Sequence, residues 1–120
     1  MNAAQAVMAS AMSEQALQKH VIAAAQTFGW RVVHFRPAKT EKGWRTAIEG
    51  DKGFPDLVLA RMGVVLHVEL KTEKGKMTGD QERWAYNLGT SWELWRPSHW
   101  LSGEIARVLA KPGQTVEWTS

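Results

Sequence analysis

The chain has 120 residues, of which 44% are apolar and 22% are charged, so we expect one globular domain with its own core. It contains no cysteine, which excludes disulfides and thiolate zinc sites, and no apolar run reaches the ~20 residues of a membrane-spanning helix. The net charge of +3 permits nucleic-acid binding without establishing it, and a cytoplasmic location is expected.

The first two segments are an uncharged leader and an amphipathic helix. Residues 1–12 lack the basic region of a signal peptide and show little patterning, so we expect either a frayed helix or a flexible leader. Ser13 suits the N-cap of a helix that Gly29 ends. Glu14 lies on the same inward face of this helix as the apolar stripe. A carboxylate on that face needs a partner, unless the helix dipole alone stabilises it. The stripe consists of Leu17, Val21, Ala24, Ala25 and Phe28.

A strand and a basic connection come next. Residues 30–36 are rich in β-branched and aromatic side chains and stop before Pro37, which predicts the first strand. Residues 37–52 form a polar connection, which is either a solvated loop or a loop that faces DNA. Trp44 either stacks on DNA or packs in an internal hairpin. We favour phosphate contact for the basic residues of this region, which are Arg36, Lys39, Lys42, Arg45 and Lys52.

Residues 53–71 predict a hairpin of two apolar strands with a turn at Met62 and Gly63. If the turn has two residues, Asp56 faces Glu69. Because strand side chains alternate between faces, the face that carries these two carboxylates also carries Lys71. The other face is the predicted core and consists of Leu57, Leu59, Val64, Leu66, Val68 and Leu70.

The two opposed carboxylates indicate a metal site. Directly opposed residues have Cβ atoms roughly 5 Å apart, and carboxylates at that range repel unless one is protonated or a cation lies between them. Mg²⁺ and Mn²⁺ suit such oxygen ligands, and Lys71 can reach a phosphate or an attacking water. This arrangement predicts metal-assisted hydrolysis of phosphodiesters. The alternative is an exposed Glu69–Lys71 salt bridge on an edge strand, with Asp56 as a turn residue.

The rest of the chain supplies a basic turn and two helices around one more strand. The turn at 72–77 carries Lys74 and Lys76, which either contact phosphates or are solvated. Thr78 and Gln81 match a capping box for a helix that ends at residue 89. We expect the Gln81 amide to serve either this box or the hairpin site, and not both. A strand at 91–95 and a last helix from 97 to 111 follow, with Gly103 as its weak point.

Three motifs together carry a resemblance to a known family. The pattern Gly53-x-Pro55-Asp56, the pattern Glu69-x-Lys71 and Gln81 resemble the PD-(D/E)XK nuclease superfamily, in particular the small stand-alone phage and bacterial VRR-NUC domains. The resemblance implies an α/β fold with a restriction-endonuclease-like core, in which a mixed β-sheet is flanked by helices in the order α-β-β-β-α-β-α. The nuclease domain would span residues 13–111, and 112–120 would be a tail.

The resemblance also implies an activity, a cofactor and partners. The expected protein is a Mg²⁺- or Mn²⁺-dependent endonuclease of a bacterial or phage-infected cell, selective for branched DNA such as Holliday junctions and active as a homodimer. Two alternatives remain, which are an inactive DNA-binding module on the same fold and a structural protein with a coincidental motif. The implied catalytic residues are Asp56, Glu69, Lys71 and Gln81, and the implied metal ligands are Asp56, Glu69, the Leu70 carbonyl and Glu14.

Overall fold

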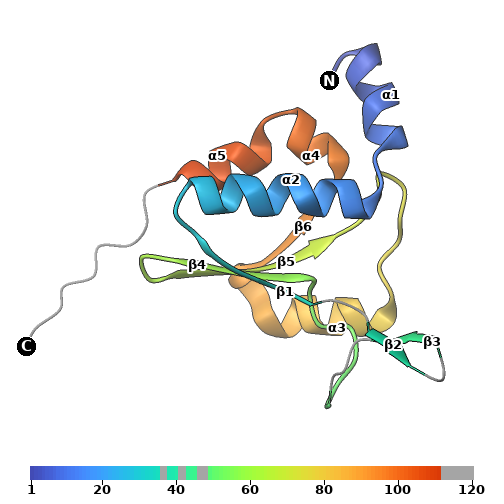
Figure 1. The fold of residues 1–120 in the computed structure, drawn as a ribbon, viewed down its shortest axis with the longest axis vertical. Helices are drawn as coiled ribbons and strands as arrows, with labels where there is room; N and C mark the ends of the chain where they lie inside the picture. The colour runs from blue at the N-terminus through green and yellow to red at the C-terminus, as the bar shows by residue number, and fades with distance from the viewer. Residues whose placement is uncertain (36–37, 41–42, 46–48, 112–120) are drawn as a thin grey trace, which may run out of the picture.

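The computed structural model describes residues 1–35, 38–40, 43–45 and 49–111, with the backbone alone described at 38–40 and 43–45. Within these ranges the chain is an α/β fold with a four-stranded mixed sheet flanked by helices (Figure 1). The strand order is β1-β4-β5-β6, in which β5 and β6 are parallel and the other two pairs are antiparallel. The predicted α/β class with a mixed sheet is confirmed.

The sheet consists of β1 (Arg31–His34), β4 (Leu57–Arg61), β5 (Val64–Leu70) and β6 (Trp92–Trp95). The two central strands, β4 and β5, form the predicted hairpin, while β1 and β6 lie at the edges. A short 3-10 helix, η1 (Gly89–Ser91), precedes β6. Each strand of the hairpin therefore pairs with an edge strand on its outer side, β4 with β1 and β5 with β6.

The hairpin turn has the predicted two residues. Arg61 pairs with Val64 across it, and Met62 and Gly63 both have positive φ, at 48° and 82°. Positive φ at both central residues gives a turn whose twist matches that of the strands, although a non-glycine residue such as Met62 adopts it at some cost. The turn geometry thus fixes the register along the whole hairpin.

Helices cover the two faces of the sheet unequally. Figure 1 shows α2 (Glu14–Thr27), α4 (Pro97–Leu101) and α5 (Glu104–Ala110) on one side of the sheet and α3 (Gly79–Leu88) on the other. The core lies on the three-helix side, where apolar side chains of α2, α5 and the hairpin meet. Full burial of one such leucine contributes about 1.5–3 kcal/mol. The core consists of Leu17, Val21, Ala25, Trp30, Leu57, Leu59, Leu66, Val68, Leu70, Trp95, Ile105 and Leu109.

Among the remaining elements, the C-terminal helix differs from the sequence-based expectation, whereas the connection at 37–52 contains the internal hairpin that was one of its two expected forms. The expected single C-terminal helix is wrong, because Gly103 adopts a left-handed conformation with φ of 85° and divides it into α4 and α5. The expected loop at 37–52 contains a small hairpin of β2 (Ala38–Thr40) and β3 (Gly43–Arg45). The tail at 112–120 lies outside the described residues.

The N-terminal segment forms α1 (Ala3–Ala11), which is the helical one of its two expected forms. Asn2 caps it through a capping box with Gln5, and its Ala9 is fully buried. None of the helices in the described ranges has both the length and the apolar character needed to cross a lipid bilayer.

Candidate active site

The two predicted carboxylates lie together at one end of the hairpin. Asp56 immediately precedes β4, and its Oδ2 accepts a hydrogen bond of 2.8 Å from the Leu70 backbone N–H. Glu69 is the next-to-last residue of β5 and is only 2% exposed. The Asp56 and Glu69 carboxyl groups are close enough for the charge of Asp56 to raise the pKa of Glu69. The register deduced from the two-residue turn therefore brings these side chains together on the face opposite the core.

The electrostatics of this pair favour one bound proton in the absence of a cation. Burial, followed by the negative charge of Asp56, raises the pKa of Glu69 to about 8, against the opposing effect of Lys71. Desolvation and Asp56 also raise the pKa of Glu14, while Lys71 lowers it. Three carboxyl groups and one ammonium group thus influence one another at a single site.

Lys71 completes the central group of charges. Its Nζ lies 3.9 Å from Glu69 Oε1, and its side chain is 12% exposed. The alternative of an exposed salt bridge on an edge strand is wrong, because the Glu69 side chain is buried, the Lys71 side chain is largely covered, and β5 is an inner strand. An ammonium group in this position offsets only part of the negative charge around Glu69.

Gln81 serves the helix cap and the site at the same time. Its Oε1 accepts a 2.9 Å hydrogen bond from the Thr78 N–H, while its Nε2 donates a 3.0 Å hydrogen bond to Glu69 Oε1. The expectation that one amide could not fill both roles is wrong, because the oxygen accepts and the nitrogen donates independently. The N-terminus of α3 is thereby fixed to the carboxyl group of Glu69.

Glu14 approaches the same site from the start of α2. Ser13 caps this helix, with its hydroxyl accepting from the Ala16 N–H at 3.0 Å, so Glu14 is the first helical residue. Its carboxyl group is influenced by Asp56 and Lys71 even though the residue is exposed. Glu14 therefore lies both at a helix N-terminus and beside the hairpin site.

The donor set suits a hard divalent cation. Within the described residues, no group of three or more His, Cys, Asp or Glu side chains is placed to hold a metal ion. Mg²⁺, however, is commonly bound through one or two carboxylates, with waters and substrate phosphates as its other ligands. Asp56, Glu69 and the Leu70 carbonyl would provide oxygen ligands of this kind. A cation bound nearby would lower the raised pKa of Glu69, because it favours the charged carboxylate.

A tight contact explains the Gly-x-Pro-Asp pattern. Gly53 has φ of 92°, and a Cβ at this position would lie 2.6 Å from the backbone carbon of Asp80. The adjacent Phe54 packs edge-on against Trp84 at 4.9 Å and against His67 at 5.9 Å. Only glycine allows this close approach of the loop to α3. The loop that leads to the first carboxylate is therefore fixed against the helix that orients the second.

Arg96 has a structural role that is not predicted from the sequence. Its Nη1 donates to the carbonyls of Thr72 at 2.7 Å, Glu73 at 3.2 Å and Gly75 at 2.7 Å. In return, Glu73 Oε2 accepts from the Ser98 N–H at 3.0 Å. These bonds fix the loop after β5, although nothing in the spacing of the sequence indicates that one arginine binds three carbonyls.

The structure places the predicted DNA-binding residues unevenly. Lys52, Lys74 and Lys76 are exposed, the first beside the 53–56 loop and the other two in the loop after β5. Their predicted contact with phosphates stays a prediction. Of the others, Lys39 and Arg45 lie in the β2–β3 hairpin, where only the backbone is described, and Arg36 and Lys42 lie outside the described residues.

Comparisons with models of protein families, with curated proteins and with solved structures found no match to this chain. The resemblance to PD-(D/E)XK nucleases therefore stays a prediction from the quoted motifs.

Proposed function

We propose that this chain is a Mg²⁺- or Mn²⁺-dependent DNA endonuclease of the PD-(D/E)XK type, with a restriction-endonuclease-like core similar to VRR-NUC domains. The observation that supports this most is the buried Glu69 carboxyl group, held against Asp56, Lys71 and Gln81. Burial of the Glu69 carboxyl group beside a second carboxyl group opposes folding when both are charged, and such an arrangement is typical of a functional site.

Each of these residues has a role that follows from its position. Asp56, Glu69 and the Leu70 carbonyl would hold the divalent ion. When bound, that ion would supply a water of lowered pKa and neutralise charge on the phosphate. Lys71 orients or activates the water, or stabilises the charge that develops on the phosphate. Gln81 holds Glu69 Oε1 in place through its 3.0 Å hydrogen bond, and Glu14 is a further acidic group at the edge of the site.

The substrate proposed is branched DNA, such as a four-way junction. Within the described residues the site lies in a single small α/β fold, so DNA shape is a more suitable basis for selectivity than a long sequence. The exposed Lys52, Lys74 and Lys76 would contact phosphates on either side of the site. A homodimer would place two such sites for two symmetric cuts.

The test is cleavage of labelled four-way junction, flap, linear duplex and single-stranded DNA, each with Mg²⁺, Mn²⁺ or EDTA. Lys71→Ala is compared with wild type, and Lys19→Ala, at an exposed position of α2, is the matched control. We expect metal-dependent cutting by wild type and by Lys19→Ala, with at least a hundredfold loss in Lys71→Ala, as for removal of one electrostatic group at an active site.

Gel shifts recorded on the same samples separate the alternatives. DNA binding without cutting in every metal would indicate an inactive DNA-binding module. Neither binding nor cutting would favour a structural protein, and the proposed activity would then be wrong.

A further inference from the structure

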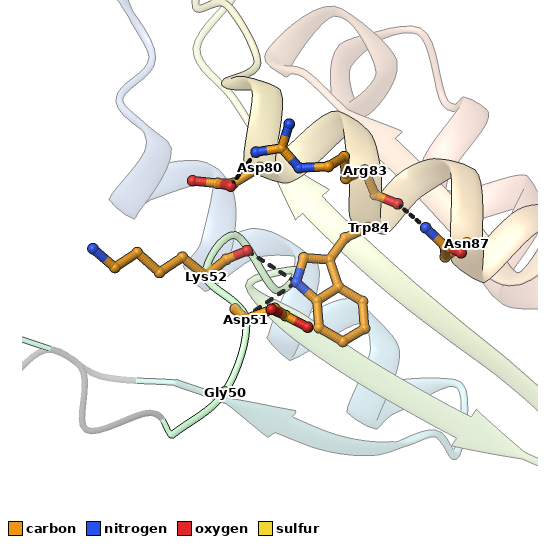
Figure 2. A pocket seen from close by; sticks show the side chains of 7 residues that line it. All are labelled: Gly50, Asp51, Lys52, Asp80, Arg83, Trp84 and Asn87. Carbon is orange, nitrogen blue, oxygen red and sulfur yellow. Dashed lines mark hydrogen bonds and ion pairs between the residues drawn. The ribbon is translucent and has the colours of Figure 1, made fainter.

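A pocket of about 640 Å³ opens beside the candidate active site, between residues 50–52 and α3 (Figure 2). The helix contributes Asp80, Arg83, Trp84 and Asn87 to its lining. This volume lies within the range of about 300–1,000 Å³ that small-molecule sites occupy. It is large enough for one nucleotide, and none of the roles proposed for the carboxylate site uses it.

Trp84 is a fixed aromatic surface in this pocket. Its Nε1 donates to the Lys52 carbonyl at 3.0 Å, with a longer contact of 3.4 Å to the Asp51 carbonyl. Figure 2 shows the indole held between this loop and the helix. Phe54 packs edge-on against the ring at 4.9 Å. The loop carbonyls and Phe54 therefore hold the indole from two directions. Because Trp84 is only half-buried, part of it remains accessible for stacking.

The charges that line the pocket balance. Lys52 and Arg83 are cationic, whereas Asp51 and Asp80 are anionic, and Arg83 is already paired with Asp80. A pocket without a net positive charge is poorly suited to hold a phosphate in its interior. An aromatic ring, together with the Asn87 amide as donor and acceptor, suits an uncharged heteroaromatic base instead.

The position of the pocket relates it to the cleavage site. Gln81, which binds Glu69, precedes Trp84 by three residues and Asn87 by six on the same helix. At 1.5 Å per residue, Trp84 and Asn87 lie about 5–9 Å further along the helix axis than Gln81, whereas Asp80, which also lines the pocket, is next to Gln81. Successive nucleotides of one strand are about 3.4 Å apart along a duplex, so this offset corresponds to roughly one to three nucleotides.

We propose that this pocket binds one unpaired nucleotide of the DNA substrate, with its base against Trp84 and its edge facing Asn87. The proposal rests on the proposed nuclease function and deepens it. The substrate class becomes DNA that has an unpaired nucleotide within a few positions of the cut, such as a flap or a junction whose branch point is opened on binding. Paired bases of a duplex interior are unavailable for such stacking.

The experiment uses a short oligonucleotide in which one 2-aminopurine is the only base and the other positions are abasic, so that no neighbouring base quenches its fluorescence and a fall in fluorescence reports stacking in the pocket. Binding is measured in EDTA, so that cutting is not required for the readout. The pocket is blocked by Asn87→Glu, and the matched control is Tyr86→Glu, which adds the same charge to the same helix at a position that is 87% exposed and does not line the pocket.

We expect wild type and Tyr86→Glu to quench the fluorescence, and Asn87→Glu to bind at least about fivefold more weakly than Tyr86→Glu, since stacking of one base on an aromatic side chain contributes 5- to 150-fold in affinity. Replacing the 2-aminopurine by an abasic position should weaken wild-type binding by a similar factor, as judged by competition.

Equal affinities of the two variants, or binding without quenching, would overturn the pocket proposal. These outcomes are separate from those of the cleavage test. Metal-dependent cutting without quenching would leave the nuclease and remove the pocket, whereas quenching that depends on Asn87 without cutting in any metal would support the pocket and contradict the nuclease.

Discussion

The substitution Glu69→Gln measures how much the buried carboxyl group lowers the free energy of unfolding. Its pKa rises from 4.5 to about 8 because of burial and, second, because of Asp56. One pKa unit corresponds to about 1.4 kcal/mol, so ionised Glu69 destabilises the metal-free protein at pH 8 by up to about 5 kcal/mol. A carboxyl group whose pKa is higher in the folded state binds its proton more tightly there. This contribution to stability is therefore greatest below pH 4.5 and is lost between pH 4.5 and 8.

Glutamine removes this cost with little change in shape. Its Oε1 can still accept from Gln81, and its neutral amide does not repel the Asp56 carboxylate. We expect metal-free Glu69→Gln to be about 2–5 kcal/mol more stable than wild type at pH 8 and to lack the decline with pH. Mn²⁺ should stabilise wild type, by about 2.7 kcal/mol at one hundred times its Kd, and should have little effect on the variant.

The assay is urea unfolding at about pH 5, 6.5 and 8, in EDTA and in Mn²⁺. Glu49→Gln, at an exposed position, is the control for loss of one negative charge. If wild type keeps constant stability between pH 5 and 8 in EDTA, or if Glu69→Gln is the less stable protein at pH 8, the reasoning about this buried carboxyl group is refuted.

Three further predictions concern the contacts around the site. Gly53→Ala should lower the free energy of unfolding by about 1–3 kcal/mol more than Gly50→Ala, as measured by urea unfolding. Both glycines have positive φ, but only a Cβ at Gly53 would meet the backbone of α3. Arg96→Lys should destabilise by about 1–3 kcal/mol and speed proteolysis of the 72–77 loop, since lysine cannot reproduce its three bonds to carbonyls; unchanged cleavage rates would contradict this. Thr78→Ala should lower the free energy of unfolding by ~1 kcal/mol through loss of the cap alone. Gln81→Ala should also reduce metal-dependent activity, because it removes the hydrogen bond to Glu69 as well as the one to Thr78. Equal activity of the two variants would show that the bond to Glu69 is dispensable.

The part of the site that depends on local rules could be predicted from the sequence. The alternation of apolar residues and the two-residue turn fix the hairpin register, and that register alone brings Asp56 and Glu69 together. The capping box at Thr78 and Gln81 is equally local. In each case the pattern spans only a few residues and has one geometric solution.

The contacts that local patterns alone do not determine depend on where distant elements dock. Gln81 can reach Glu69 only because α3 lies across the end of β5, and Arg96 finds carbonyls that are more than twenty residues away in the chain. The division of the last helix was a local event, but a single glycine inside an apolar stripe is compatible with either a weakened or a broken helix. Only the packing of Ile105 and Leu109 into the core settles it.

The position of α3 suggests how DNA shape could be linked to cutting. This one rigid helix carries Gln81, which orients the Glu69 carboxyl group, and Trp84, which forms the aromatic surface of the pocket. The loop at Gly53 and Phe54 is fixed against the same helix and leads directly to Asp56. A nucleotide bound at Trp84 would therefore be held in a constant relation to both carboxylates, because no flexible element separates them. Selectivity for unpaired DNA would then require no separate recognition domain.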